Sequence, residues 1–203
     1  ETIKPEILLE VIDTAPSETR KIDCVDYQIS LRYSKVADSC LAEYFELLQL
    51  LKGFSGIDYT VRRQTDFNSQ PEIPRILRKI VQNKDILAPI LDPQNGLLRI
   101  RVACSECGLT DKKGINTKYH EDRLESYCPE HGWFETYFNG ESEKFEFNTP
   151  LRNLIRGIVY GKDNQNTAIP FEWLRVTGSD YAGYYQEQLL YRAASLLGTS
   201  AHE

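Results

Sequence analysis

The 203-residue sequence contains no methionine, only two tryptophans and only three histidines. Because even an initiator methionine is missing, we expect these residues to be part of a longer polypeptide. The sequence also lacks any run of about 18 apolar residues, the length that spans a bilayer, so we expect no membrane-spanning segment and no membrane partner. No signal peptide opens the chain, and we therefore expect a cytoplasmic protein. Its oligomeric state is left open.

The chain has no surplus of basic residues, since 24 Lys and Arg stand against 30 Asp and Glu and give a net charge of −6. This balance argues against broad nucleic-acid binding. The 41% hydrophobic content is enough for a substantial buried core. We therefore expect an ordinary globular protein with one main domain and a small appendage.

The five cysteines are an odd number, and Cys24 and Cys40 stand far apart in the sequence. A disulfide framework also needs an oxidising compartment, which the missing signal peptide argues against. Cys40 falls on the apolar face of an expected helix and is predicted to belong to the core. The other three cysteines, Cys104, Cys107 and Cys128, belong to a metal-binding motif.

Cys104, Cys107, Cys128 and His131 follow a C-x2-C-x20-C-x2-H spacing. Three thiolates and one imidazole at these intervals are typical of a tetrahedral zinc site, and a glycine after each second ligand allows the backbone to turn under the metal. Catalytic zinc usually keeps an open position, whereas this spacing supplies four ligands. We therefore predict a structural zinc, with catalytic zinc, a disulfide or chance as the alternatives.

Hydrophobic periodicity and turn residues predict the regular elements. A helix should begin at Val36 and stop at Gly53, with its apolar residues inward. Around the zinc, Leu97–Ala103 should lead into the metal segment and Trp133–Phe138 should return from it, so that the metal lies at a hairpin tip. The other expected strands and helices are Ile7–Ile12, Cys24–Leu31, Ile57–Arg63, a helix after Pro74, Ile86–Leu91 and Pro150–Tyr160.

The expected helix at Pro150–Tyr160 carries Thr149 as its N-cap and Leu151, Leu154, Ile155 and Ile158 on its inward face. Arg152 and Arg156 lie on the other face. They are predicted mainly to be solvated, with contact to phosphate or to an acceptor strand as the alternative.

The segment from Phe171 onward is predicted to form a buried strand, a turn at Gly178-Ser179-Asp180, and then a helix to Leu197. Ligands bind at such strand-to-helix junctions in open α/β sheets, since free backbone N–H groups and a glycine allow close approach. A turn with an aspartate cap explains the same residues without a ligand. Both interpretations stay open at this point.

The order of these parts resembles the catalytic domain of class I aminoacyl-tRNA synthetases, most closely the class I lysyl-tRNA synthetases. Three segments carry the resemblance. The first is the helical stretch from Pro74 to Leu91 followed by Cys104-Ser-Glu-Cys107-Gly108. The second is Thr149-Pro-Leu-Arg-Asn-Leu-Ile-Arg156. The third is Val176-Thr-Gly-Ser-Asp-Tyr181, which is similar to the family's Gly-x-Asp-His or Gly-x-Asp-Gln loop.

The resemblance implies an α/β Rossmann-like nucleotide-binding fold with an inserted zinc ribbon and a helical connective segment. Residues 1–96 would form part of the core and the connective segment, residues 97–140 the zinc ribbon, and residues 141–203 the return to the core. It further implies that an amino acid is activated with ATP and transferred to an acceptor, for which tRNA is the usual molecule. Gly178, Ser179 and Asp180 would contact the adenosine ribose, and Tyr181 and Tyr184 would line the amino-acid pocket.

Several departures from the family pattern bear on activity. The His-x-Gly-His motif and the Lys-x-Ser-Lys loop are absent from these residues. His131 stands where a cysteine is usual, and Tyr181 replaces the loop's His or Gln. We expect the missing motifs to lie outside the given residues. A paralogue without activity, and a non-catalytic zinc-ribbon interaction module, are the alternatives, and the sequence does not name the amino acid.

Overall fold

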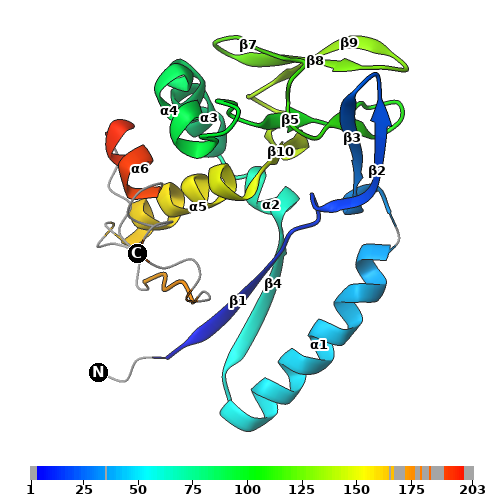
Figure 1. Ribbon diagram of the computed structural model, residues 1–203. Helices are drawn as coiled ribbons and strands as arrows, with labels where there is room; N and C mark the ends of the chain where they lie inside the picture. Colours follow the sequence, from blue (N-terminus) through cyan, green and yellow to red (C-terminus); the bar gives the residue numbers. More distant parts are fainter. Residues whose placement is uncertain are drawn as a thin grey trace.

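The computed structural model describes residues 4–34, 36–164, 166, 172–176, 179, 183 and 190–198, although not the side chains of 36–40. Within these ranges the protein is a mixed α/β structure whose strands form four small sheets and no barrel (Figure 1). No helix in the described part of the chain has both the length and the apolar character needed to cross a bilayer.

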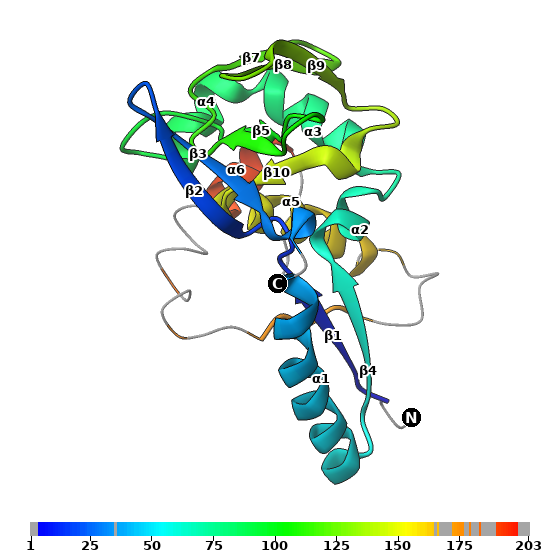
Figure 2. The same ribbon diagram turned by 90° about the vertical axis from the view of Figure 1, so that its right-hand side faces the viewer.

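The first sheet is a parallel pair of β1 (Glu6–Val11) and β4 (Asp58–Arg63), and it confirms two of the predicted strands. Helix α1 (Val36–Ser55) precedes β4 in the chain and lies along the pair. Figures 1 and 2 show this unit extending away from the rest of the molecule, with α1 at the end opposite the strands β7–β9.

Helix α1 runs further than predicted and buries less. Gly53 lies inside the helix, which ends at Ser55. Gly56 follows with a positive φ of 70°, and a hydrogen bond from Gly56 N to Lys52 O closes the last turn. Leu41 and Leu48 are buried, but the remaining large apolar residues of the described part are exposed. A two-stranded sheet is a narrow surface, so it covers only one line of side chains along the helix. The exposed residues are Tyr44, Phe45, Leu47, Leu50, Leu51 and Phe54. Cys40 lies outside the described side chains.

A three-stranded antiparallel sheet joins segments that are far apart in the sequence. The hairpin of β2 (Pro16–Ile22) and β3 (Val25–Ser30) pairs through β3 with β6 (Leu109–Asp111), which directly follows the first pair of cysteines. The predicted strand at Cys24–Leu31 is thereby confirmed. A short 3-10 helix, η1 (Leu31–Tyr33), follows β3.

The main hydrophobic core lies between a two-stranded sheet and a group of helices. The sheet pairs β5 (Ile100–Val102) with β10 (Phe145–Phe147), and a 3-10 helix, η2 (Ser142–Lys144), precedes β10. The predicted inward residues of α5 (Thr149–Asn164) are buried, and α3 (Ile73–Gln82) buries Ile76, Leu77, Ile80 and Val81. The helices are α2 (Gln64–Asn68), α3 (Ile73–Gln82), α4 (Lys84–Leu91), α5 (Thr149–Asn164) and α6 (Arg192–Leu196).

Two details of α5 differ from the prediction. The side-chain oxygen of Asn148, rather than that of Thr149, accepts a hydrogen bond from a backbone N–H of the first turn, that of Leu151. Arg152 and Arg156 do not form a solvated face, because Arg152 is 8% exposed and the side chain of Arg156 is 11% exposed. The helix is covered on both sides, which the spacing of its leucines and isoleucines alone could not indicate.

The metal segment does not form the predicted hairpin. β9 (Gly132–Tyr137) pairs with β8 (Arg123–Cys128), which pairs with β7 (Thr117–Tyr119), whereas β5 pairs with β10. The incoming strand is also shorter than expected, because Arg99 has a φ of 56° and its side chain binds Asp92. This left-handed residue separates Leu97 and Leu98 from the extended strand.

The predicted buried strand before Gly178 is wrong over residues 172–176. These residues are not in a strand, and Leu174 and Val176 are 84% and 97% exposed. Ser179 is exposed. Gly178, Asp180, Tyr181 and Tyr184 lie outside the described residues, so the loop expected to contact a nucleotide is not among them.

A fully buried carboxylate connects the β2–β3 hairpin to the main core. Glu146 of β10 accepts hydrogen bonds from Ser30 Oγ at 2.6 Å, Arg32 Nη2 at 3.0 Å and Gln28 Nε2 at 3.3 Å. Arg101 Nε of β5 lies 4.0 Å from the same carboxylate. A buried charge is tolerated only when it is paired and hydrogen-bonded. Donors from β3 and η1 meet that condition here, and Arg101 of β5 adds a second positive charge.

Replacing Glu146 with glutamine should destabilise the fold, because it removes the carboxylate but leaves the buried guanidinium groups of Arg32 and Arg101. Loss of one partner of a buried pair costs about 3–5 kcal/mol. We expect a loss of that size in urea unfolding. Glu125→Gln, which breaks an exposed ion pair with Lys118, is the matched control and should change the unfolding midpoint little. Equal stability of both variants would contradict the role given to Glu146.

Candidate metal centre

The four predicted zinc ligands lie together, although they come from two separate turns. One ligand atom from each of Cys104, Cys107, Cys128 and His131 lies within 4.8 Å of all the others. His131 Nδ1 is 3.5 Å from Cys104 Sγ and 3.6 Å from Cys128 Sγ, and Cys107 Sγ is 3.6 Å from Cys128 Sγ. The cysteines are not in disulfide bonds. The predicted site residues therefore form one cluster that can bind a metal such as zinc.

These separations match a tetrahedral zinc site. Zn–S bonds of about 2.3 Å and Zn–N bonds of about 2.0 Å, at tetrahedral angles, place two sulfurs about 3.8 Å apart and a sulfur and a nitrogen about 3.5 Å apart. Three thiolates and one imidazole are also the donor set that zinc prefers. Four protein ligands fill the coordination shell, which is the arrangement of structural rather than catalytic zinc.

The backbone turns that present the ligands require glycine, as the sequence predicted. Gly108 and Gly132 follow the second ligand of each turn and have φ values of 75° and 81°. In the first turn, Gly108 N donates to Cys104 O and Cys104 N donates to Leu109 O, both at 2.8 Å. A side chain at either glycine would strain the turn.

A small hydrophobic cluster, separate from the main core, surrounds the ligands. Buried Cys104 and Cys128 pack with Tyr27 and Leu109, and partly buried residues of the β2–β3 hairpin and β9 complete the cluster. The sequence between the two pairs of ligands is largely polar and supplies few apolar side chains. The structure supplies apolar partners from the hairpin instead. Those partners are Ile22, Val25, Tyr27 and Ile29, and Phe134 of β9 joins them from the metal segment.

The charges around the site favour a bound cation and a nearby guanidinium. Burial, together with the neighbouring Cys128 and Cys104, raises the pKa of the Cys107 thiol to about 12. Zinc binds the thiolate form of cysteine, so metal binding favours ionised ligands. With zinc bound, three thiolates leave a net charge of −1. The pKa of Arg20 is raised mainly by Glu18, and Cys107 is close enough to contribute to the rise.

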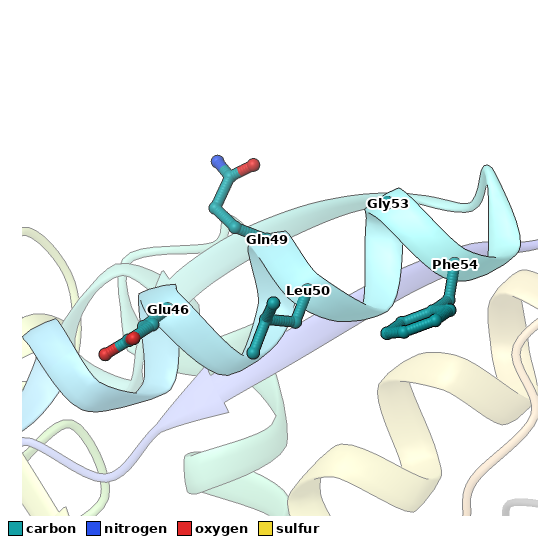
Figure 3. Close-up of a pocket in the computed structure, with 5 residues that line it drawn as sticks. All are labelled: Glu46, Gln49, Leu50, Gly53 and Phe54. Atoms are coloured by element: carbon teal, nitrogen blue, oxygen red, sulfur yellow. The ribbon is translucent and has the colours of Figure 1, made fainter.

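A shallow hollow on the surface of α1 has no relation to this cluster (Figure 3). It has a volume of about 370 Å³ and is lined by Glu46, Gln49, Leu50, Gly53 and Phe54, all from the one helix. Its only ionisable lining residue is Glu46.

In comparisons with known proteins, no protein-family model, no curated protein and no solved structure matched this chain. The chemistry assigned to the site therefore rests on its own geometry.

Sequence reasoning missed one group of functional interest. Glu10, Arg62 and Arg156 meet where β1 and β4 end against α5. The three residues are separated by about 50 and 90 positions and belong to no local motif. Because helical periodicity placed Arg156 on a solvated face, no signal in the sequence could have joined them.

Metal content tests the centre directly. We expect one zinc per chain by elemental analysis and a marked loss in Cys107→Ser, because a hydroxyl does not replace a thiolate ligand. Cys24→Ser is the matched control, since Cys24 is exposed at the hairpin turn and should leave the metal content unchanged. An unchanged metal content in Cys107→Ser would contradict the assignment of Cys107 as a zinc ligand.

The affinity for the metal should become weaker as the pH is lowered. The raised pKa of Cys107 keeps its thiol protonated without metal at neutral pH, so metal binding must release protons. Lowering the pH favours the protonated, metal-free form. We expect the apparent zinc affinity, measured by chelator competition, to drop by at least about tenfold from about pH 8 to about pH 6. A pH-independent affinity would rule out thiolate ligation.

Proposed function

We propose that this chain is the catalytic-domain part of an aminoacyl-tRNA synthetase-like ligase. In this proposal the enzyme activates an amino acid with ATP as its adenylate and transfers the aminoacyl group to an acceptor. The acceptor is tRNA, the usual acceptor in the family that the sequence resembles. A zinc-stabilised segment inserted between α4 and α5 carries the proposal, because it stands in the order in which the resembling sequences place their ribbon.

The parallel pair β1–β4 supports the nucleotide-binding fold proposed here. Parallel strands need a crossover connection, and α1 lies in the connection between these two. Units of this kind build Rossmann-like folds, in which ligands bind beyond the carboxyl ends of the strands. We propose that β1, α1 and β4 belong to such a fold.

Adenylate formation requires little covalent chemistry from the protein. The amino-acid carboxylate attacks the α-phosphate of ATP and pyrophosphate leaves, so positioning and charge stabilisation supply most of the acceleration. We assign ribose contacts to Gly178, Ser179 and Asp180, with Asp180 accepting hydrogen bonds from the ribose hydroxyls. Tyr181 and Tyr184 are assigned to the amino-acid pocket.

Zinc has a structural role in this proposal. Its four ligands come from the turns before β6 and between β8 and β9, so the metal holds the two turns together. No step of the reaction passes through the metal.

A non-catalytic interaction module is the second candidate, and the outer face of the β7–β9 sheet favours it. Trp133 is 48% exposed and packs on Tyr127 at a ring distance of 5.3 Å. Lys118 Nζ lies 3.8 Å from the centre of the Trp133 ring. An exposed aromatic and cationic surface of this kind suits contact with another macromolecule. A synthetase paralogue without activity is a further alternative.

Ligand-induced stabilisation distinguishes these candidates. The full-length, zinc-loaded protein is titrated with ATP and with a panel of aminoacyl-sulfamoyl-adenosines in a thermal-shift experiment. A ligand that binds only the folded protein raises its melting temperature, by roughly 5 °C or more at about 100 times its Kd. A shift with one analogue would support the ligase and name its amino acid.

The variant Asp180→Ala should lose most of that shift. Asp85→Ala is the control, because Asp85 is an exposed aspartate paired only with its neighbour Lys84 among the described residues. If no analogue stabilises the zinc-loaded protein, the ligase proposal fails and the interaction module takes its place.

A further inference from the structure

A cluster of opposite charges lies at the carboxyl ends of the parallel strands. Glu10 and Arg62 are direct neighbours in the register of β1 and β4, each one residue before its strand ends. Helix α5 adds Arg156 and Tyr160 to the same place. Figure 1 shows both strands running toward the part of the molecule that contains α2 and α5. This edge of a parallel sheet is where α/β proteins bind ligands.

In this cluster the carboxylate of Glu10 pairs with two guanidinium groups, those of Arg62 and Arg156. Glu10 Oε1 accepts hydrogen bonds from Arg62 Nη2 at 2.8 Å and from Tyr160 OH at 2.6 Å. Arg156 Nε lies 2.9 Å from Glu10 Oε2, at ion-pair distance but without hydrogen-bond alignment. Arg62 Nη2 also contacts Tyr160 OH. Among the described residues, Glu10 is the one carboxylate that pairs with either arginine, so the cluster carries one surplus positive charge.

This surplus charge is poorly compensated. The side chains of Arg62 and Arg156 are 23% and 11% exposed, and the Nε atom of each is buried without a hydrogen-bond partner. Burial lowers the pKa of Arg156; Glu10 opposes the effect, while Arg175 and Arg62 add to it. Burying unbalanced charge is costly. The whole protein has a net charge of −6, yet two arginine side chains lie together at this edge.

Neighbouring groups fix the two arginines in place. Phe67 lies beneath both, with its ring centre 5.2 Å from the guanidinium carbon of Arg62 and 5.7 Å from that of Arg156. Arg156 Nη2 donates to Gln64 Oε1 at 2.6 Å. The donors are thus held before any ligand arrives, which lowers the entropic cost of binding.

From these contacts we infer that Arg62 and Arg156 form a binding site for a phosphate group, as carried by a nucleotide or by inorganic pyrophosphate. Arginine forks match the oxygens of phosphate and form strong charge-assisted hydrogen bonds with them. Phosphate brings at least one full negative charge and several acceptor oxygens. It therefore neutralises the surplus and contacts both guanidinium groups while Glu10 keeps its place between them.

The inference does not depend on the proposed ligase. A phosphate group can bind at these arginines even if no aminoacyl-adenylate analogue stabilises the protein. Conversely, the ligase could bind its analogue at the loop containing Asp180 without using Arg62.

Isothermal titration of the full chain with inorganic pyrophosphate tests the site, with ATP and AMP titrated in parallel. Arg62→Gln is the informative variant, because Arg62 is the more exposed of the two arginines. Loss of charge-assisted hydrogen bonds should weaken binding by about tenfold or more. Tighter binding of ATP than of pyrophosphate would identify a nucleotide as the source of the phosphate, and equal or weaker binding would identify inorganic pyrophosphate.

Arg123→Gln is the matched control, since Arg123 lies on β8 and pairs with Asp122 and Glu135. Its affinity for pyrophosphate should equal that of the unaltered protein. Circular dichroism and the melting temperature establish that Arg62→Gln is folded, and Arg62→Lys, which keeps the charge, should recover part of the affinity. The inference is overturned if the unaltered protein binds none of the three ligands, or if Arg62→Gln and Arg123→Gln lose affinity equally.

Discussion

The carboxylate of Glu146 holds together segments that the chain order separates. Its donors come from the N-terminal hairpin and from Arg32 of η1, which follows the hairpin, while Glu146 itself lies in the central sheet beside Arg101. Because a buried charge must be paired, the hydrogen bonds to Glu146 hold the hairpin in this position against the core. That position sets β3 beside β6, and β6 begins two residues after Cys107. The geometry of the metal ligands therefore depends on an ion pair that lies outside the metal segment.

The metal centre was predictable because its chemistry is local. Each pair of ligands is close in sequence, and a glycine follows each pair, so spacing alone indicated both the donor atoms and the turns. Most strands and helices with a clear apolar period were predictable for the same reason. The prediction of a strand at residues 172–176 is wrong, because a short apolar run does not reveal whether another layer of the protein covers it.

Long-range partners could not be predicted from the sequence. Arg156 has the spacing of a surface residue, and only the fold brings Glu10 to it across nearly the whole chain. The pairing of β5 with β10, rather than with β9, likewise depends on which strand the core places beside it. The exposed apolar residues of α1 show the same limit, because periodicity identifies an apolar face but not the width of the surface that covers it.

The pairing of β3 with β6 has a consequence for how this segment could have been exchanged between proteins. A zinc ribbon that closes on itself can be transplanted whole. Here Tyr27 and the hairpin residues around it supply part of the hydrophobic lining of the ligands. A fragment cut at residues 97 and 140 would retain every metal ligand but would lose that lining and one hydrogen-bonded strand. In this chain, the metal segment and the N-terminal hairpin are therefore packed as one unit, and a cut between them would expose the ligands on one side.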